Sequence, residues 1–277
     1  MYEDIAIVLT IFDGYEDLWD DCIRFIEIFW PDHPHIYVIT NEIVKTWPNV
    51  YCYPAGKDAE WSKKVQKAAD IVTEKYVILL LEDFYIGAPV NNIKLQTLIK
   101  FIKDNNLKYC KLCDNNRAFK PLKKHYDNSR YFVIYADEAY GVNLQASIWD
   151  KDYLIDTVGK ENYNAWVFEL NQLNETYNKP HKRLEFAIED MSNILNIRHG
   201  ALQGKMLPNT VRYFKRIGCP LSSDREVMSS ILYFLCYLKF LGRQVIPGFA
   251  KKTIKSVARR LGYEFVSDKW TEKTTNK

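Results

Sequence analysis

Two adjacent carboxylates follow directly on a short aliphatic run. Residues 77–81 are five consecutive aliphatic side chains, and Glu82 and Asp83 come next without a spacer. A run this short and rich in strand-forming residues is typical of a central strand buried on both faces. Open α/β sheets bind ligands outside the carboxyl ends of their strands, and paired carboxylates hold hard divalent cations that in turn hold phosphate. The pair therefore predicts a metal and phosphate site, with two solvated acids at a strand end as the alternative.

A polar turn follows the first predicted strand. Thr10, Asp13 and Tyr15 lie in or beside this turn and can bind a base and a ribose through their side chains. Neither a Gly-x-Gly-x-x-Gly fingerprint nor a Gly-x-x-x-x-Gly-Lys-Ser/Thr loop accompanies them. Because those glycine-rich loops cradle the phosphates of dinucleotides and nucleoside triphosphates, dehydrogenases and P-loop enzymes are disfavoured.

A second group of candidate phosphate contacts occurs late in the chain. Gly200 and Gly204 would let the backbone approach a diphosphate closely, and Arg198 and Lys205 could neutralise its charge. The alternative for this segment is a surface loop that carries an exposed histidine, His199.

Strand-like and helix-like patterns alternate through the first two thirds of the chain. Periodicity predicts strands at 5–12, 35–40, 49–53, 77–81, 108–112, 131–136 and 142–149. It predicts helices at 15–29, 59–73, 90–103, 151–158, 164–173 and 183–195. Alternation of this kind favours βαβ units, so we expect an α/β protein with a mostly parallel sheet flanked by helices.

The last part of the 277-residue chain differs in composition. Residues 227–263 lack acidic side chains and carry seven basic ones, so the remainder is net negative although the whole chain is +3. We expect a catalytic domain at 1–220 and a helical, basic segment at 221–277. The amphipathic stretch 251–261 can lie on an anionic membrane surface or pack on the catalytic domain, and both alternatives stay open.

The chain contains no pattern typical of a secreted, membrane-spanning or nucleic-acid-binding protein. No apolar run approaches the roughly 20 residues of a spanning helix, and no basic leader precedes the first apolar run. The acidic body and the absence of a recognised motif disfavour nucleic acid as a partner. We expect a cytoplasmic protein, peripheral on the inner face of the cell membrane if the basic segment binds lipid.

Four segments, taken in this order, resemble the nucleotide-sugar glycosyltransferases of the GT-A class, and among them the bacterial capsule and surface-polysaccharide enzymes. They are Trp61 with its following helix, Leu-Leu-Leu-Glu-Asp-Phe at 79–84, Asn-Leu-Gln-Ala-Ser-Ile-Trp at 143–149 and Trp-Val-Phe-Glu at 166–169. The resemblance covers residues 5–215. It implies a GT-A-like fold in which the first half of the sheet holds the nucleoside and an acid motif holds a divalent metal on the diphosphate.

The resemblance also implies roles for individual residues on the donor side. Asp83 would be the metal-facing acid, Glu82 would touch the ribose or a metal-bound water, and Trp61 would contact the donor. His199 lies where many members of the class present a metal or phosphate contact. The expected cofactor is Mn²⁺ or Mg²⁺, although the adjacent acids depart from the Asp-x-Asp pattern of the class.

The acceptor side requires a carboxylate that removes a proton from the attacking hydroxyl, if the configuration is inverted. Glu169 opens a predicted helix after the sheet, where the class places its base, and Asp190 is the second choice. Trp166 could pack against a sugar face, while Gln145 and Trp149 could shape the acceptor side. The alternatives are a surface helix acid for Glu169 and a core position for Trp149.

We therefore expect an enzyme of the hexosyltransferase type that serves capsule polysaccharide biosynthesis. It would transfer a sugar from a nucleoside diphosphate donor to a glycan or lipid-linked oligosaccharide. The alternative is a nucleotidyltransferase-like or non-catalytic nucleotide-binding α/β protein. A nucleotidyltransferase would normally show a basic, glycine-rich turn after the first strand, and residues 12–15 do not offer one.

Overall fold

The computed structural model describes residues 2–112, 124–234 and 236. The chain divides into two compact units, of which the larger comprises Met1–Asn115 and Leu122–Met228. The smaller comprises Asn116–Pro121 and Ser229–Lys277, and its described residues are helical from 230 to 234. The predicted boundary at residue 220 stays a prediction, and the basic stretch 251–261 lies outside the described residues. No helix among the described residues is long and apolar enough to cross a membrane.

The larger unit is built on one sheet whose described strands run in the order β3-β2-β1-β4-β8-β6-β9-β7. The strands are β1 Ile5–Thr10, β2 Ile36–Thr40, β3 Val50–Pro54, β4 Tyr76–Leu80, β6 Tyr109–Lys111, β7 Phe132–Tyr135, β8 Ser147–Asp150 and β9 Arg183–Glu189. Of these, β7 and β8 pair antiparallel with their neighbours and the others share one direction. The predicted mostly parallel α/β sheet is confirmed.

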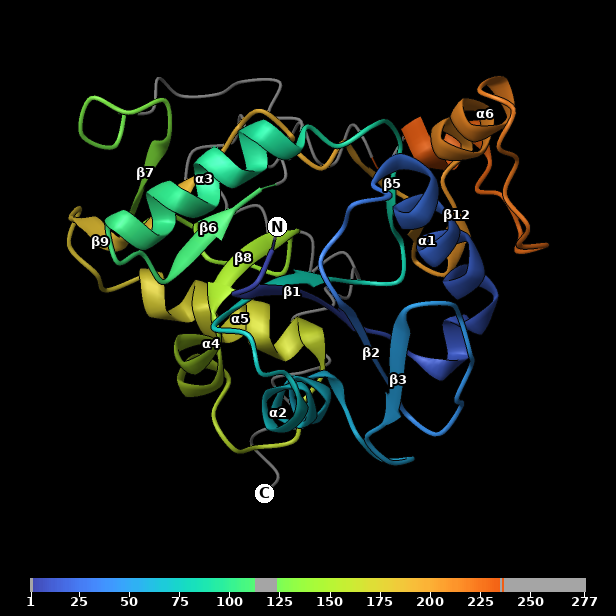
Figure 1. Cartoon of the computed structure of the whole chain (residues 1–277), viewed down its shortest axis with the longest axis horizontal. Helices are drawn as coiled ribbons and strands as arrows, with labels where there is room; N and C mark the ends of the chain where they lie inside the picture. The colour runs from blue at the N-terminus through green and yellow to red at the C-terminus, as the bar shows by residue number, and fades with distance from the viewer. Residues whose placement is uncertain (1, 113–123, 235, 237–277) are drawn as a thin grey trace, which may run out of the picture. The chain divides into compact units, whose positions relative to one another are not determined.

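Helices cover both faces of this sheet, as Figure 1 shows. One face carries α1 Glu16–Phe29, α3 Asn92–Asp104 and α6 Pro208–Arg216, and the other carries α2 Trp61–Ile71, α4 Lys151–Val158 and α5 Ala165–Thr176. Successive side chains of a strand point to opposite faces, so β4 sends Ile78 into the first layer and Val77 and Leu79 into the second. All five residues of β4 are buried, as an aliphatic central strand requires.

Two predicted elements differ from the structure. Residues 183–195, predicted as a helix, form β9 and a turn, because Arg183–Glu189 pairs with β6 on one side and β7 on the other. That pairing outweighs a local preference for helix. The predicted strand 142–149 is shortened to β8, because Asn143 Oδ1 accepts a hydrogen bond from the Gln145 backbone N–H at 3.0 Å and holds a loop there.

Two short antiparallel ladders complete the larger unit. The first joins β5 Phe84–Ile86, directly after the acid pair, to β10 Ile197–His199. The second is a hairpin of β11 Ala201–Leu202 and β12 Lys205–Met206. Its two turn residues, Gln203 and Gly204, both have positive φ, which suits a two-residue hairpin turn. These ladders bring residues 197–206 beside the end of β4.

Glu74, at the amino end of β4, gives the fold an acid-sensitive contact. Its carboxylate lies 3.0 Å from Nδ1 of His35 and 3.2 Å from the Thr73 hydroxyl. Burial opposes its ionisation, but the hydrogen bonds from His35, the backbone and Thr73 outweigh burial and lower the pKa of Glu74. A lowered folded pKa contributes stability that is present at neutral pH and is lost as the pH falls through that pKa.

We expect Glu74→Gln to lower the free energy of unfolding by about 1 kcal/mol at neutral pH. The loss should be much smaller in acid, where the wild-type carboxyl is protonated in both the folded and the unfolded state. Urea unfolding at the two pH values checks this, with Asp70→Asn, an exposed carboxylate of α2, as the control. Equal losses at both pH values would contradict the assignment.

Candidate functional site

A row of buried polar side chains lies at the carboxyl edge of the sheet. Among the described residues it comprises Thr10, Thr40, Asn41, Glu82, Lys111, Glu189 and Asp190. They end or follow β1, β2, β4, β6 and β9, whose carboxyl ends lie at the same edge because these strands share a direction. Buried polar groups cost free energy unless they are paired, so their concentration at one edge marks a site.

Glu82 is the more deeply buried member of the acid pair, with 8% of its surface exposed. Burial and the neighbouring Asp83 charge raise the pKa of Glu82 to about 8, while hydrogen bonds from the backbone and the charge of Lys64 oppose the rise. A cation that enters the site would favour the charged form of Glu82.

Asp83 and His199 are brought together by the ladder between β5 and β10. The Gly200 backbone N–H donates to the Asp83 carbonyl at 2.6 Å, and Phe84 lies opposite His199 in the register. Burial raises the pKa of Asp83 and lowers that of His199, and each partially offsets the shift of the other. A Cβ atom at Gly200 would lie 2.7 Å from the Tyr85 ring, so this close approach requires glycine.

A carboxylate and an imidazole are both groups that could serve as ligands of a divalent cation. No group of three or more His, Cys, Asp or Glu side chains that could hold a metal occurs within the described part of the chain. Mg²⁺ is commonly bound by one or two carboxylates and completes its shell with substrate phosphates and water. Asp83 and His199 could therefore hold a cation together with a diphosphate.

Arg198 does not join this pair. It is exposed, and its guanidinium carbon lies 3.4 Å from the centre of the Tyr213 ring. Adjacent residues of a strand point to opposite sides, so Arg198 and His199 diverge. Its predicted phosphate contact is not supported in this arrangement.

Asp13 holds the turn after β1 against the loop after β2. Its carboxylate accepts hydrogen bonds from the backbone N–H groups of Asn41, Glu42 and Ile43 at 2.9, 2.8 and 2.9 Å. Thr10, at the end of β1, is buried, and its hydroxyl has no hydrogen-bond partner within the part of the chain that the structure describes. Asp13 thus shapes the turn, whereas Thr10 keeps an unused hydroxyl beside it.

Lys64 is a site residue that sequence reasoning missed. Its buried ammonium donates to the Ile11 carbonyl at 2.6 Å and to Asn41 Oδ1 at 2.8 Å. Burial lowers the pKa of Lys64, and the charges of Glu82 and Asp13 oppose that shift. The sequence did contain a signal for Lys64, because Lys64 follows Trp61 by one helical turn and therefore shares the apolar face of α2.

Arg225 is a second missed residue, and it holds the rim of the site near Tyr15. Its guanidinium carbon lies 4.4 Å from the centre of the Tyr15 ring. It donates to the carbonyls of Gly14 and Gly204 at 3.1 and 3.2 Å and forms an ion pair with Asp17. The turn after β1 is thereby joined to the β11–β12 hairpin.

Lys205 lies on that hairpin, and its ammonium is 2.7 Å from Glu226 Oε1. Both side chains of this pair reach solvent, with 37% and 71% exposure. The charge of Lys205 is therefore already shared with a carboxylate before any phosphate binds.

The tryptophans predicted to contact ligands separate into two kinds. Trp149 is fully buried, its ring 4.4 Å from that of Tyr109, so the predicted acceptor contact is corrected to a core position. Trp61 is also buried and packs on Phe168 at 4.9 Å, which makes it a support for α2 and α5 in this structure. Trp166 is 60% exposed on the first turn of α5 and remains free to meet a ligand.

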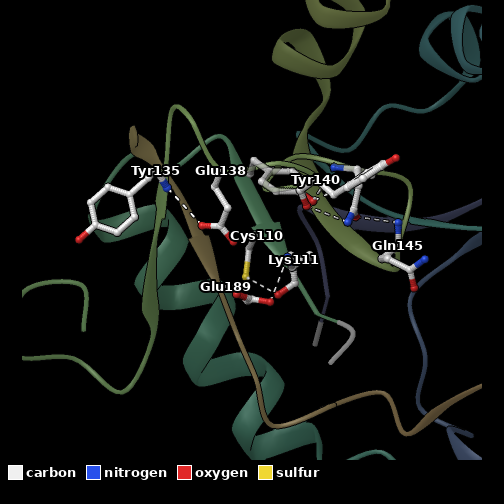
Figure 2. A network of polar contacts seen from close by, with 9 residues as sticks. Cys110, Lys111, Tyr135, Glu138, Tyr140, Gln145 and Glu189 are labelled. Atoms are coloured by element: carbon white, nitrogen blue, oxygen red, sulfur yellow. Dashed lines mark hydrogen bonds and ion pairs between the residues drawn. The ribbon is translucent and has the colours of Figure 1, made fainter. Parts of the chain in front are cut away.

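Glu169 and Gln145 meet at the loop before β8. Glu169 Oε1 accepts a hydrogen bond from the Leu144 backbone N–H at 3.4 Å, and burial raises the pKa of Glu169. Gln145, labelled in Figure 2, donates its backbone N–H to Asn143 Oδ1, and its buried Oε1 atom has no hydrogen-bond partner among the described residues.

Asp190 follows β9 directly and lies at the same edge as the acid pair. Its backbone N–H donates to the Lys111 carbonyl at 2.8 Å. Its carboxylate accepts from the Ser192 hydroxyl at 2.6 Å and from the Ser192 backbone N–H at 3.3 Å. The side chain is therefore fixed, and it is nearly inaccessible to solvent.

The sheet and the polar side chains at its carboxyl edge define an α/β protein with a mostly parallel sheet. No protein-family model matches the chain, and no curated protein sequence matches it. Solved structures do match, and they include glycosyltransferases and nucleotidyltransferases, the two classes weighed from the sequence.

The similar structures share little sequence with this chain. TarS of S. aureus in complex with UDP has a TM-score of 0.42 and 11% identity over 68% of this chain, which covers 58% of the TarS chain. An active-site mutant of LgtC has a TM-score of 0.37 and 14% identity, covering 81% of this chain and 84% of that one. A cytidylyltransferase from Leptospira borgpetersenii has a TM-score of 0.41 and 11% identity, covering 68% and 76%. At these values the likeness concerns the general α/β architecture.

Proposed function

We propose that the protein transfers a sugar from a nucleoside diphosphate donor to a hydroxyl of a glycan acceptor. The observation that supports this proposal best is the approach of Asp83 and His199 at the end of β4, next to the turn that follows β1. A cation held there would face a diphosphate whose nucleoside lies over the neighbouring turn.

The donor half of the site has the parts that such a ligand needs. Phe12 is 53% exposed in the turn after β1 and offers an aromatic face to a base. Tyr15 lies beside it, with ring centres 5.9 Å apart. The unused hydroxyl of Thr10 could accept or donate one hydrogen bond to the nucleoside.

Transfer with inversion breaks one bond as it forms another. A carboxylate takes the proton of the acceptor hydroxyl, the acceptor oxygen attacks the anomeric carbon, and the bond from that carbon to the phosphate oxygen breaks. The electron pair leaves with the nucleoside diphosphate. A divalent cation, when bound at Asp83 and His199, would stabilise that charge as a Lewis acid. Asp190 and Glu169 are the candidate bases.

The acceptor is proposed to be a surface glycan. Trp166, exposed on the same helix as Glu169, could stack on a sugar ring of the acceptor. If that glycan is lipid-linked, peripheral binding of the C-terminal basic segment to the membrane would bring the enzyme to it.

A panel of nucleotides tests the proposal directly. UDP, GDP, dTDP and CDP are added with and without Mn²⁺, and the melting temperature is measured. We expect one diphosphate at about a hundred times its Kd to raise it by about 5 to 10 °C, with a larger rise when Mn²⁺ is present. The matching nucleotide sugars are then assayed for release of free diphosphate.

Two outcomes would contradict the proposal. If no diphosphate stabilises the protein with or without metal, there is no donor site of the proposed kind. If only CTP or another triphosphate binds and pyrophosphate is released with a sugar phosphate as co-substrate, the enzyme is a nucleotidyltransferase instead.

A further inference from the structure

A buried ion pair connects the ends of β6 and β9. Lys111 Nζ lies 3.0 Å from Glu189 Oε1, and the two side chains are 0% and 2% exposed. The residues face each other in the register of the two strands. Figure 2 shows the two side chains directed at each other beside Cys110. Neither residue figures in the transfer chemistry described above.

Stability alone does not explain such a pair. Taking two charges out of water costs about as much as their attraction returns, and an apolar pair of similar volume is often equally stable. The pair is therefore better explained by what it holds in place.

What it holds is the first residue after β9. The Lys111 carbonyl accepts the backbone N–H of Asp190 at 2.8 Å, while the Lys111 ammonium binds the side chain of Glu189. Lys111 thus contacts Glu189 through its side chain and Asp190 through its backbone carbonyl. The Ser192 turn fixes the Asp190 carboxylate from the other side.

We propose that Lys111 and Glu189 are a positioning pair that holds Asp190 where it can take the proton of the acceptor hydroxyl. The inference rests on the proposed function and adds a residue assignment to it. The Lys111 ammonium also lies 3.0 Å from the Glu189 carboxylate and therefore offsets its charge. The pair itself does not touch the reacting atoms.

The informative variant replaces both partners by apolar side chains of similar length. Single substitutions remove one charge of the pair and leave the other charge buried without this partner, which destabilises the fold, whereas K111M/E189M removes both charges together. We expect this double variant to melt within a few degrees of the wild type and to bind the diphosphate with an unchanged Kd. We expect its kcat to fall about 100-fold at an unchanged donor KM.

The matched control reverses the pair. K111E/E189K keeps an attraction between the same two positions, so kcat should recover at least tenfold relative to K111M/E189M. Amide hydrogen exchange of residues 186–193 is measured in all three proteins, because it reports the hold on Asp190 without any substrate. We expect faster exchange in K111M/E189M and protection restored in K111E/E189K.

The outcomes distinguish this inference from the proposed function. Unchanged kcat and unchanged exchange in K111M/E189M would overturn the positioning role and leave the transferase assignment intact. Exchange is measured even if no donor sugar is turned over, so unchanged exchange alone overturns the inference in that case. A wild-type protein that binds no nucleoside diphosphate would instead contradict the proposed function, whatever the exchange shows.

Discussion

Asp83→Asn is expected to lower kcat/KM for sugar transfer by about 10² to 10³-fold. Asparagine keeps the size and the carbonyl oxygen of the side chain but loses the charge that would hold a divalent cation on the leaving diphosphate. Several kcal/mol of transition-state stabilisation correspond to a loss of this size. The backbone bond from Gly200 to the Asp83 carbonyl is untouched, so the fold should survive.

The measurement separates the metal from the nucleotide. Kd values for the diphosphate are determined with and without Mn²⁺ in the wild type, Asp83→Asn and His199→Ala. Both variants should lose the Mn²⁺-dependent part of the affinity and keep the metal-free part. Asp156→Asn, at an exposed carboxylate of α4, is the control. If Asp83→Asn binds and transfers as the wild type does, the acid pair is not the metal site.

Asp190→Asn is expected to cost about 10² to 10⁴-fold in kcat, the usual range for a positioned general base. The expected effect of Glu169→Gln is smaller than tenfold. Asp190 ends a strand at the same edge as the acid pair and is held rigidly by Ser192. Glu169 lies on α5, and its carboxylate accepts a hydrogen bond from the Leu144 backbone N–H. We therefore propose the reverse of the order given from the sequence, in which Glu169 came first and Asp190 second.

Single-turnover rates on the two variants check this order, with melting temperatures recorded in parallel. Glutamine can still accept the Leu144 bond and asparagine the Ser192 bonds, so both proteins should remain folded. A large loss in Glu169→Gln with little change in Asp190→Asn would restore the original assignment. It would also remove the basis for a positioning role of Lys111 and Glu189.

The first half of the fold was predictable because its signals are local. The periodicity of apolar residues predicts the aliphatic strands and the amphipathic helices α1, α2 and α3, and the acid pair marks a strand end. The strand β9 was not predictable in the same way. Its identity depends on pairing with β6 and β7, which lie far away in sequence. The approach of His199 to Asp83 also depends on a ladder between distant segments, and only the family resemblance gave reason to expect it.

Individual site residues were predictable only where chemistry and exposure agree. The sequence does not distinguish the buried Trp149 from the exposed Trp166, because both stand in aromatic segments next to polar residues. Lys64 could have been found, since a lysine on an apolar helix face must find a partner. Arg225 could not have been found in this way, because its partners Asp17 and Gly14 lie far from it in the sequence, near the amino terminus.

The contact between Arg225 and Asp17 has a consequence for the time at which the site is complete. The two residues are 208 positions apart in the sequence. During synthesis, domains form as the chain emerges from its amino terminus, and contacts between distant residues must await the later partner. The turn after β1 is translated first, yet it is closed by one of the last arginines of its unit. A nascent chain shorter than about 225 residues therefore carries an unfinished nucleoside side, and nucleotide would not be expected to stabilise it.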